Sequence, residues 1–205
     1  MERNQTHRDP KPPRRTQTER REDAQRRLRE AAIASLAECG YAGASTTEIA
    51  RRAGLSQGGL FGHYASKAEL FAAAAATVYT EMRDEYRRAL QTADRGGDST
   101  AASIRILWDL YRRPAMKASL ELAMAARTDL RLRRALEPVF QLATEENQAL
   151  ATELSPGSGF SRPQILTTVI WAIQGAAMDA FVTPEIADVE EFLTTLTEFA
   201  QSTGT

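Results

Sequence analysis

The sequence predicts an all-α protein of about nine helices, with an N-terminal three-helix domain that contains a helix-turn-helix and a larger C-terminal helical domain. Three observations support this prediction. After Thr18 nearly every segment repeats its apolar residues at helical spacing, and none alternates apolar and polar residues as a half-buried strand does. Glycine and proline clusters divide the chain into segments of helical length. The 205 residues, 42% of them hydrophobic and 26% charged, suffice for one or two soluble domains with a buried core.

Residues 1–18 are predicted to form a disordered basic arm. The arm contains three prolines and five Lys or Arg residues, and it has no aliphatic residue beyond Met1. Such a segment cannot bury enough apolar surface to offset the entropy lost on ordering. A basic arm can reach DNA phosphates, but we favour the interpretation that it is simply solvated.

The next four predicted helices each have a start or a stop signal. Gly40 ends the first helix. The runs Ser45–Glu48 and Ser66–Glu69 are capping boxes that begin the second and the fourth, because their serine hydroxyl and glutamate carboxylate satisfy free backbone donors. Ser56 caps the third. In order, these helices cover about 19–38, 45–54, 57–64 and 66–90.

Four or five further helices are predicted after a linker at residues 93–100. Pro114 ends the first of them, and Pro138 is expected to kink or split the third. A run of serine, proline and glycine at 155–159 separates the third from the fourth. In order, these helices cover about 101–113, 115–127, 130–154, 163–182 and 186–201.

Charge is divided unevenly along a chain whose net charge is −1. Residues 1–67 contain 13 Lys and Arg against 8 Asp and Glu, and the remaining residues contain 13 against 19, which gives +5 and −6. This division is typical of a nucleic-acid-binding module joined to an acidic regulatory or assembly module, although a chance fluctuation of surface charge produces the same numbers. Motifs must decide between the two interpretations.

The second and third predicted helices have the spacing of a helix-turn-helix, in which the second helix enters the DNA major groove. Helical hairpins unrelated to DNA share this spacing. The residues are more specific, since the run STTEIARRAGLSQGGLFGHYASKAEL from Ser45 to Leu70 closely resembles the DNA-binding signature of TetR-family transcriptional regulators. The matching residues are Thr46, Ile49, Ala50, Ala53, Gly54, Ser56, Gly58, Leu60, His63, Ser66, Lys67 and Leu70. The resemblance implies a DNA-binding domain at 19–66 and an effector-binding and dimerisation domain at 67–205.

The resemblance also implies a role for each residue of the motif. Contacts with the sugar-phosphate backbone are expected from Thr46 or Thr47, Ser56 and Lys67 at the helix starts, and from His63 and Tyr64 on the exposed end of the third helix. Contacts with bases are expected from Gln57, Gly58, Gly59 and Phe61. The alternatives are a surface or capping role for His63 and an unpartnered lysine at a helix start for Lys67.

Three residues depart from the family pattern. Phe61 replaces the usual Tyr and lacks its hydroxyl donor, and Gly59 and Gly62 replace residues with side chains. Each glycine costs roughly 1 kcal/mol relative to alanine within a helix. We therefore expect this recognition helix to read few bases and to depend on phosphate register and DNA shape.

The last two predicted helices are the candidates for a dimer interface. The helix at 163–182 is apolar around nearly its whole circumference and must be covered on two sides, and the helix at 186–201 has a coiled-coil-like apolar stripe. The resemblance implies that both meet their symmetry mates in a four-helix bundle, through Ile165, Val169, Ala172, Ala176, Phe192, Leu196 and Phe199. Alternatively, 163–182 is the central core helix of a monomer.

Large apolar side chains in the C-terminal part are candidates for a ligand pocket with few polar anchors. They are Trp108, Tyr111, Met116, Leu120, Met124, Phe140, Trp171 and Met178. Taken singly, such residues are more often plain core than pocket lining.

Several classes of protein are excluded or disfavoured. One Cys and two His residues cannot form an internal disulfide or a His/Cys zinc site. The N-terminus lacks the apolar segment of a signal peptide, and the uncharged stretch 163–178 is too short to span a bilayer. An enzyme is disfavoured because no acidic, basic or nucleophilic groups converge. We expect a cytoplasmic, cofactor-free, homodimeric repressor that binds a palindromic DNA operator and is released by a small apolar effector; the alternative is a constitutive DNA-binding regulator without an effector.

Overall fold

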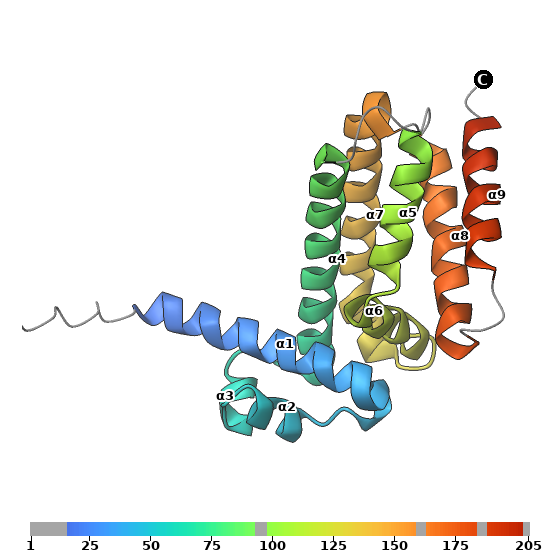
Figure 1. Ribbon diagram of the computed structural model, residues 1–205. Coiled ribbons are helices and arrows are strands. Elements are labelled where there is room, and N and C mark those ends of the chain that lie inside the picture. The colour runs from blue at the N-terminus through green and yellow to red at the C-terminus, as the bar shows by residue number, and fades with distance from the viewer. Residues whose placement is uncertain (1–15, 93–97, 159–162, 184–187, 203–205) are drawn as a thin grey trace, which may run out of the picture.

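The computed structural model describes residues 16–92, 98–158, 163–183 and 188–202, and these residues form nine α-helices and no strand (Figure 1). The all-α prediction is therefore confirmed. The helices are α1 (Gln17–Gly43), α2 (Thr46–Arg52), α3 (Gln57–Phe61), α4 (Lys67–Thr92), α5 (Ser99–Tyr111), α6 (Pro114–Ala125), α7 (Leu130–Ser158), α8 (Pro163–Val182) and α9 (Val189–Ser202).

Two of the predicted helix starts form as expected and one does not. The Ser56 hydroxyl accepts a hydrogen bond from the amide of Gly59 at 3.0 Å, and the Ser66 hydroxyl accepts one from Glu69 at 3.1 Å. The predicted capping box at Ser45 is wrong, because Ser45 makes no side-chain cap and the Glu48 carboxylate binds arginines instead.

The start of α1 and the middle of α7 also differ from the prediction. Thr16 caps α1, so residues 16–18, which were assigned to the arm, begin a helix; residues 1–15 lie outside the described residues. The predicted break at Pro138 is wrong, since α7 continues through it and ends only at Ser158. A proline removes one backbone donor, and packing of the rest of the helix face against α4 and α8 outweighs that loss.

The described helices are arranged in two parts (Figure 1). Helices α1, α2 and α3 lie together at one end, and the first half of α1 projects beyond the rest of the molecule. Helices α4, α5, α7, α8 and α9 stand side by side in an upright bundle, with α6 across its base next to α1. Helix α4 follows α3 directly and belongs to both parts.

The buried side chains form two clusters. The first joins α1, α2, α3 and the start of α4 to α6 and α7, and it includes Leu28, Ile49, Leu60, Phe71 and Leu122. The second fills the upright bundle around Trp108, Val169 and Leu193. The helix-turn-helix part therefore shares its core with helices that come 50 or more residues later in the chain.

Candidate nucleic-acid interface

Helices α2 and α3 are joined by a tight turn whose geometry requires glycine. Gly54 has φ 68°, the left-handed region that glycine occupies without strain. Its amide donates to the carbonyl of Arg51 at 3.0 Å, and the next amide, that of Leu55, donates to the carbonyl of Ala50 at 2.9 Å. These two bonds form a Schellman cap, which ends α2 and turns the chain into α3.

Side chains of α1 hold this turn in place. Arg27 Nη1 donates to the carbonyl of Ala53, the C-cap of α2, at 2.8 Å. Ile49 and Leu60, one from each short helix, are completely buried against α1 and α4. The angle between α2 and α3 is therefore set by long-range contacts and not by the turn alone.

The outer face of α3 is short and nearly free of long side chains. Gln57 and Gly58 are exposed, Gly59 is half-buried, and 46% of Phe61 is exposed. The Gln57 amide lies 3.4 Å from the hydroxyl of Thr46. Phe61 is the largest apolar group on this face, and an exposed ring of this kind can pack on a thymine methyl group.

Thr47 and Ser56 are exposed and Thr46 is half-buried, all at the starts of α2 and α3 where free backbone amides are available to an anion. The placements of Thr46, Thr47, Ser56, Gln57 and Phe61 are thus compatible with the contacts expected from the sequence.

His63 and Tyr64 do not lie where the sequence suggested. Helix α3 ends at Phe61, so both residues follow it. Tyr64 is buried, with 6% exposed, and its hydroxyl is 3.3 Å from Nη1 of Arg29. His63 is half-buried, and its Nδ1 atom is enclosed. Tyr64 therefore packs the chain after α3 onto α1. The prediction that Tyr64 is exposed against the sugar-phosphate edge of DNA is wrong.

Lys67 also points inward. Its Nζ donates to the backbone carbonyl of Tyr41 at 2.6 Å and lies 4.4 Å from the centre of the Tyr41 ring. Burial lowers the pKa of Lys67. The predicted phosphate contact does not fit this placement, because the ammonium group is already bound to the end of α1.

Two arginines at the end of α2 were not among the predicted site residues. Arg51 is 73% exposed and Arg52 31% exposed, and both donate to Glu48, at 2.7 and 2.9 Å. Hydrogen bonds from Arg51 and then Arg52 lower the pKa of Glu48 to about 2. Arg52 also pairs with Glu38 of α1 at 2.6 Å. The sequence contained a signal for these residues, since two adjacent arginines lie in the last turn of the predicted helix that crosses the DNA backbone.

Most of the predicted ligand-binding residues are dispersed. Trp108, Tyr111 and Leu120 are core residues with less than 5% exposure, whereas Met124, Trp171 and Met178 are exposed by 45%, 70% and 36%. A single pocket cannot contain both groups. Phe140 lines a shallow hollow beside Leu136 and Arg133.

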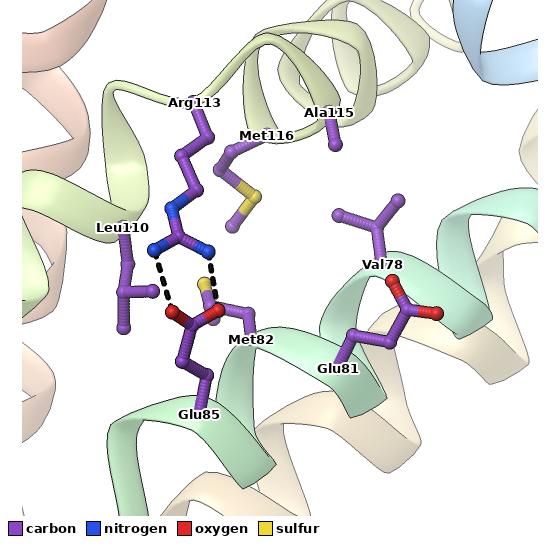
Figure 2. Close-up of a pocket in the computed structure, with 8 residues that line it drawn as sticks. All are labelled: Val78, Glu81, Met82, Glu85, Leu110, Arg113, Ala115 and Met116. Carbon is purple, nitrogen blue, oxygen red and sulfur yellow. Dashed lines mark hydrogen bonds and ion pairs between the residues drawn. The ribbon is translucent and has the colours of Figure 1, made fainter. Parts of the chain in front are cut away.

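Met116 lines a small pocket of about 80 Å³ between α4, α5 and α6 (Figure 2). Val78, Met82 and Leu110 form its apolar wall. Glu81 and Glu85 stand on the α4 side, and Arg113 faces them from the start of α6 and makes two hydrogen bonds to Glu85, one of them 2.6 Å long (Figure 2). The pocket therefore combines two thioethers with two carboxylates, one of them paired with Arg113, which is more polar than the sequence suggested.

The predicted dimer residues divide into two groups. Ile165, Val169 and Leu196 are 0–7% exposed in the bundle core and cannot also face a partner. Ala172, Ala176 and Phe192 are half-buried, and Phe199 is 43% exposed. The prediction assigned the wrong face of α8 to the interface. Because α8 is apolar on all sides, its periodicity does not show which side packs inside the bundle.

The exposed side of α8 carries Trp171, Gly175, Met178 and Val182, one residue per turn. Trp171 is 70% and Val182 81% exposed, and a Cβ built on Gly175 meets no atom within 4 Å. Among the described helices α8 is the one long and apolar enough to match a membrane span, with a mean hydropathy of 1.5 over Gln164–Val182 and 28% of that stretch buried. Exposed apolar side chains that gather on one helix face are typical of an interaction surface.

Comparisons with known proteins agree with this architecture. Residues 28–74 match the profile of the bacterial regulatory proteins of the tetR family. The chain is 30% identical over 174 residues to a helix-turn-helix transcriptional regulator of Mycobacterium bovis, covering 83% of this chain and 89% of that one. It is 28% identical to the regulator CymR of Pseudomonas putida, covering 82% and 84%.

Solved structures show the same fold. The multidrug binding protein EbrR, crystallised with imidazole, superposes with a TM-score of 0.65 at 24% identity over 86% of this chain and 94% of that one. FadR of Bacillus subtilis, in complex with stearoyl-CoA, superposes with a TM-score of 0.62 at 14% identity over 88% and 98%. Together with the helix-turn-helix of α2 and α3, these matches show that the chain is a DNA-binding transcriptional regulator of the TetR family and not an enzyme.

Proposed function

We propose that this regulator is a cytoplasmic repressor that binds a palindromic operator as a homodimer and leaves it when a small organic effector binds the helical bundle. The observation that carries the proposal is the pair of exposed surfaces at opposite parts of the molecule: the face of α3 with Gln57 and Phe61, and the apolar face of α8 with Trp171.

The α3 face favours contacts that depend on DNA shape as much as on base identity. Gln57 is the one side chain on this face with a bidentate hydrogen-bonding group, and adenine is its usual partner. Phe61 adds an apolar contact. The exposed Arg51 supplies positive charge in the last turn of α2, and phosphates can bind backbone amides at the starts of α2 and α3.

The α8 face favours a second copy of this chain as its cover. A two-fold axis beside α8 places Trp171 and Val182 of one copy against the same helix of the other, and the bare backbone at Gly175 permits close approach of the two helices. Phe199 of α9 is a further large apolar side chain that is exposed, by 43%. A dimer then presents two α3 helices to successive major grooves, about 34 Å apart.

We place the effector in the pocket at Met116 because it lies between three helices, α4, α5 and α6, although about 80 Å³ holds only a few non-hydrogen atoms. An effector must therefore widen it, and the ion pair between Arg113 and Glu85, which joins the α6 side of the pocket to its α4 side, must separate or tilt (Figure 2). The effector releases DNA only if it binds this opened form more tightly than the DNA-bound form. The fold neighbours EbrR and FadR were crystallised with organic molecules, which supports an effector of this general kind.

Electrophoretic mobility shift with the DNA upstream of the protein's own gene tests the DNA proposal. Binding should weaken linearly in a plot of log affinity against log salt concentration. Phe61→Ala should lower the affinity by about tenfold, the equivalent of roughly 1.4 kcal/mol from one lost base contact. Leu142→Ala, which removes an equally exposed side chain from α7, is the matched control and should leave affinity unchanged. Absence of a shift at low salt refutes the DNA proposal.

A constitutive regulator without an effector is the second candidate, and it is favoured by one observation: the pockets that the described residues line at Met116, Leu142 and Phe140 are small or shallow. Thermal unfolding with a panel of amphipathic organic compounds separates the two candidates, because a compound at 100 times its Kd should stabilise the native state by about 2.7 kcal/mol. Stabilisation by none of them supports the constitutive regulator.

A further inference from the structure

The backbone turns sharply near the end of α1, and a residue of α6 contacts it there. Gly40 has φ 69°, which interrupts the helix within the span of α1. A Cβ built on Gly40 would lie 2.5 Å from Oε1 of Glu121, a residue of α6. Glycine is therefore required at this position for its backbone conformation, and it also leaves room for a carboxylate from the other part of the molecule.

Tyr41, the next residue, is bound through four of its groups, namely its amide, hydroxyl, carbonyl and ring, and we call these contacts the Tyr41 clasp. Its backbone amide donates to Glu121 Oε1 at 2.6 Å, and its hydroxyl donates to Asp129 Oδ2 at 2.9 Å. Its carbonyl accepts from Lys67 Nζ at 2.6 Å, and the same ammonium lies over its ring. The ring also meets Phe71 edge to face, with centroids 5.5 Å apart.

The partners of Tyr41 come from both parts of the molecule. Lys67 and Phe71 belong to the first turns of α4, whereas Glu121 lies in α6 and Asp129 lies between α6 and α7. The bonds to Glu121 and Lys67 are charge-assisted, and bonds of that kind are about twice as strong as neutral ones. Burial and the hydrogen bond to Asp129 raise the pKa of Tyr41 to about 12, so the phenol remains a donor at neutral pH.

Helix α6 connects this corner to the pocket at Met116. Arg113 precedes the helix and spans the pocket, Met116 lies in its first turn, and Glu121 follows on the side that meets α1. From Arg113 to Glu121 is about 12 Å at the helical rise of 1.5 Å per residue. A rigid element of this length carries a tilt at one end to the other, because packed helices move as units.

We propose that the Tyr41 clasp sets the angle between the helix-turn-helix and the bundle, and that Glu121 on the Tyr41 amide is the contact through which α6 changes that angle. Glu121, Asp129 and Lys67 are positioning residues for DNA binding, since they touch α1 and not DNA. The inference rests on the proposed function for its biological meaning, but its first test does not require DNA.

The first test measures the angle directly, through electron-spin distances between labels at Ala34→Cys in α1 and Gln148→Cys in α7, two exposed positions. The background carries Cys39→Ala, and labelled chains are diluted into excess unlabelled chain so that each assembly holds one pair. The expected result is a narrow distribution with native Glu121, a broader or shifted one with Glu121→Ala, and recovery with Glu121→Gln, whose amide oxygen still accepts from Tyr41. Glu137→Ala, which removes an exposed carboxylate from α7, is the control and should leave the distribution unchanged.

The second test measures DNA affinity with the same variants. Glu121→Ala should weaken binding by about tenfold, as expected for one charge-assisted hydrogen bond that holds the binding geometry. The salt dependence should keep the same slope because no phosphate contact is lost. Glu121→Gln should restore most of the affinity, which a loss of stability alone does not predict.

Two results overturn the inference: a distance distribution for Glu121→Ala that matches the native one, or native DNA affinity together with a native distribution in Tyr41→Phe. If Glu121→Ala does not fold, Tyr41→Phe decides, since it removes the hydrogen bond to Asp129 and keeps the ring. Failure of the native protein to bind any DNA refutes the proposed function instead and leaves the distance measurement valid.

Discussion

The turn between α2 and α3 yields a prediction from two glycines in the same motif. Gly54→Ala introduces a side chain at φ 68°, and a left-handed conformation costs an alanine about 1–2 kcal/mol. The new Cβ would also lie 3.2 Å from Arg27 Nη1, so this guanidinium must shift by a few tenths of an ångström and loosen its 2.8 Å bond to Ala53. Weakening that charged hydrogen bond adds about 1 kcal/mol.

The expected loss for Gly54→Ala is therefore about 2–3 kcal/mol in the free energy of unfolding, measured by urea denaturation with an unchanged m-value. Gly58→Ala is the matched control. Gly58 is helical, and the nearest atom to its Cβ is Ser56 Oγ at 3.9 Å, so alanine should stabilise α3 by up to about 1 kcal/mol. Equal stability of the two variants, or a native free energy for Gly54→Ala, refutes the conformational argument.

The remaining predictions concern the dimer face, the α2 arginine cluster and Lys67. Trp171→Ala should weaken dimerisation by at least 2 kcal/mol per chain, because 70% of a ring of roughly 200 Å² becomes buried at about 25 cal/mol per Å², less the costs of association; sedimentation equilibrium checks this, and an unchanged dimer constant excludes α8 from the interface. Glu48→Gln should reduce the loss of unfolding free energy between about pH 4 and pH 2. The pKa of Glu48 is lowered to about 2 in the folded protein, so its stabilising contribution is complete above the unfolded pKa of about 4.3 and is lost as the pH falls toward 2. An unaltered pH profile shows that the cluster with Arg51 does not stabilise the fold. Lys67→Gln should lower the thermal midpoint while leaving the salt slope of DNA binding unchanged, whereas Arg51→Gln should reduce that slope by about one; the reverse pattern restores Lys67 as a phosphate contact.

Much of the fold follows from local signals. Gly40 and Gly54 both occur at positive φ where the sequence predicted helix ends, and Ser56 caps α3 as expected. These features depend on a few neighbouring residues, so they are accessible without knowledge of the rest of the chain. Pro138 is the counterexample, since its local tendency to break a helix is outweighed by packing along α7.

The candidate site is less accessible from local signals. The sequence motif contains Tyr64 and Lys67. It does not show that the Tyr64 ring packs against α1 or that the Lys67 ammonium group binds the carbonyl of Tyr41. Similarly, the apolar repeat of α8 does not show which of Val169 and Trp171 is in the core. Each of these outcomes depends on residues distant in the chain.

The sequence by itself determined the helical class, most helix boundaries, the helix-turn-helix and the family, because these depend on periodicity, capping residues and a dense local motif. The tertiary structure alone decided which faces are covered and which remain free: the inward Lys67, the exposed face around Trp171 and the joining of Tyr41 to Glu121. The physical reason is that burial and hydrogen bonding across 80 residues of chain arise only when α6 packs against α1, and no local preference at Tyr41 or Glu121 encodes that contact.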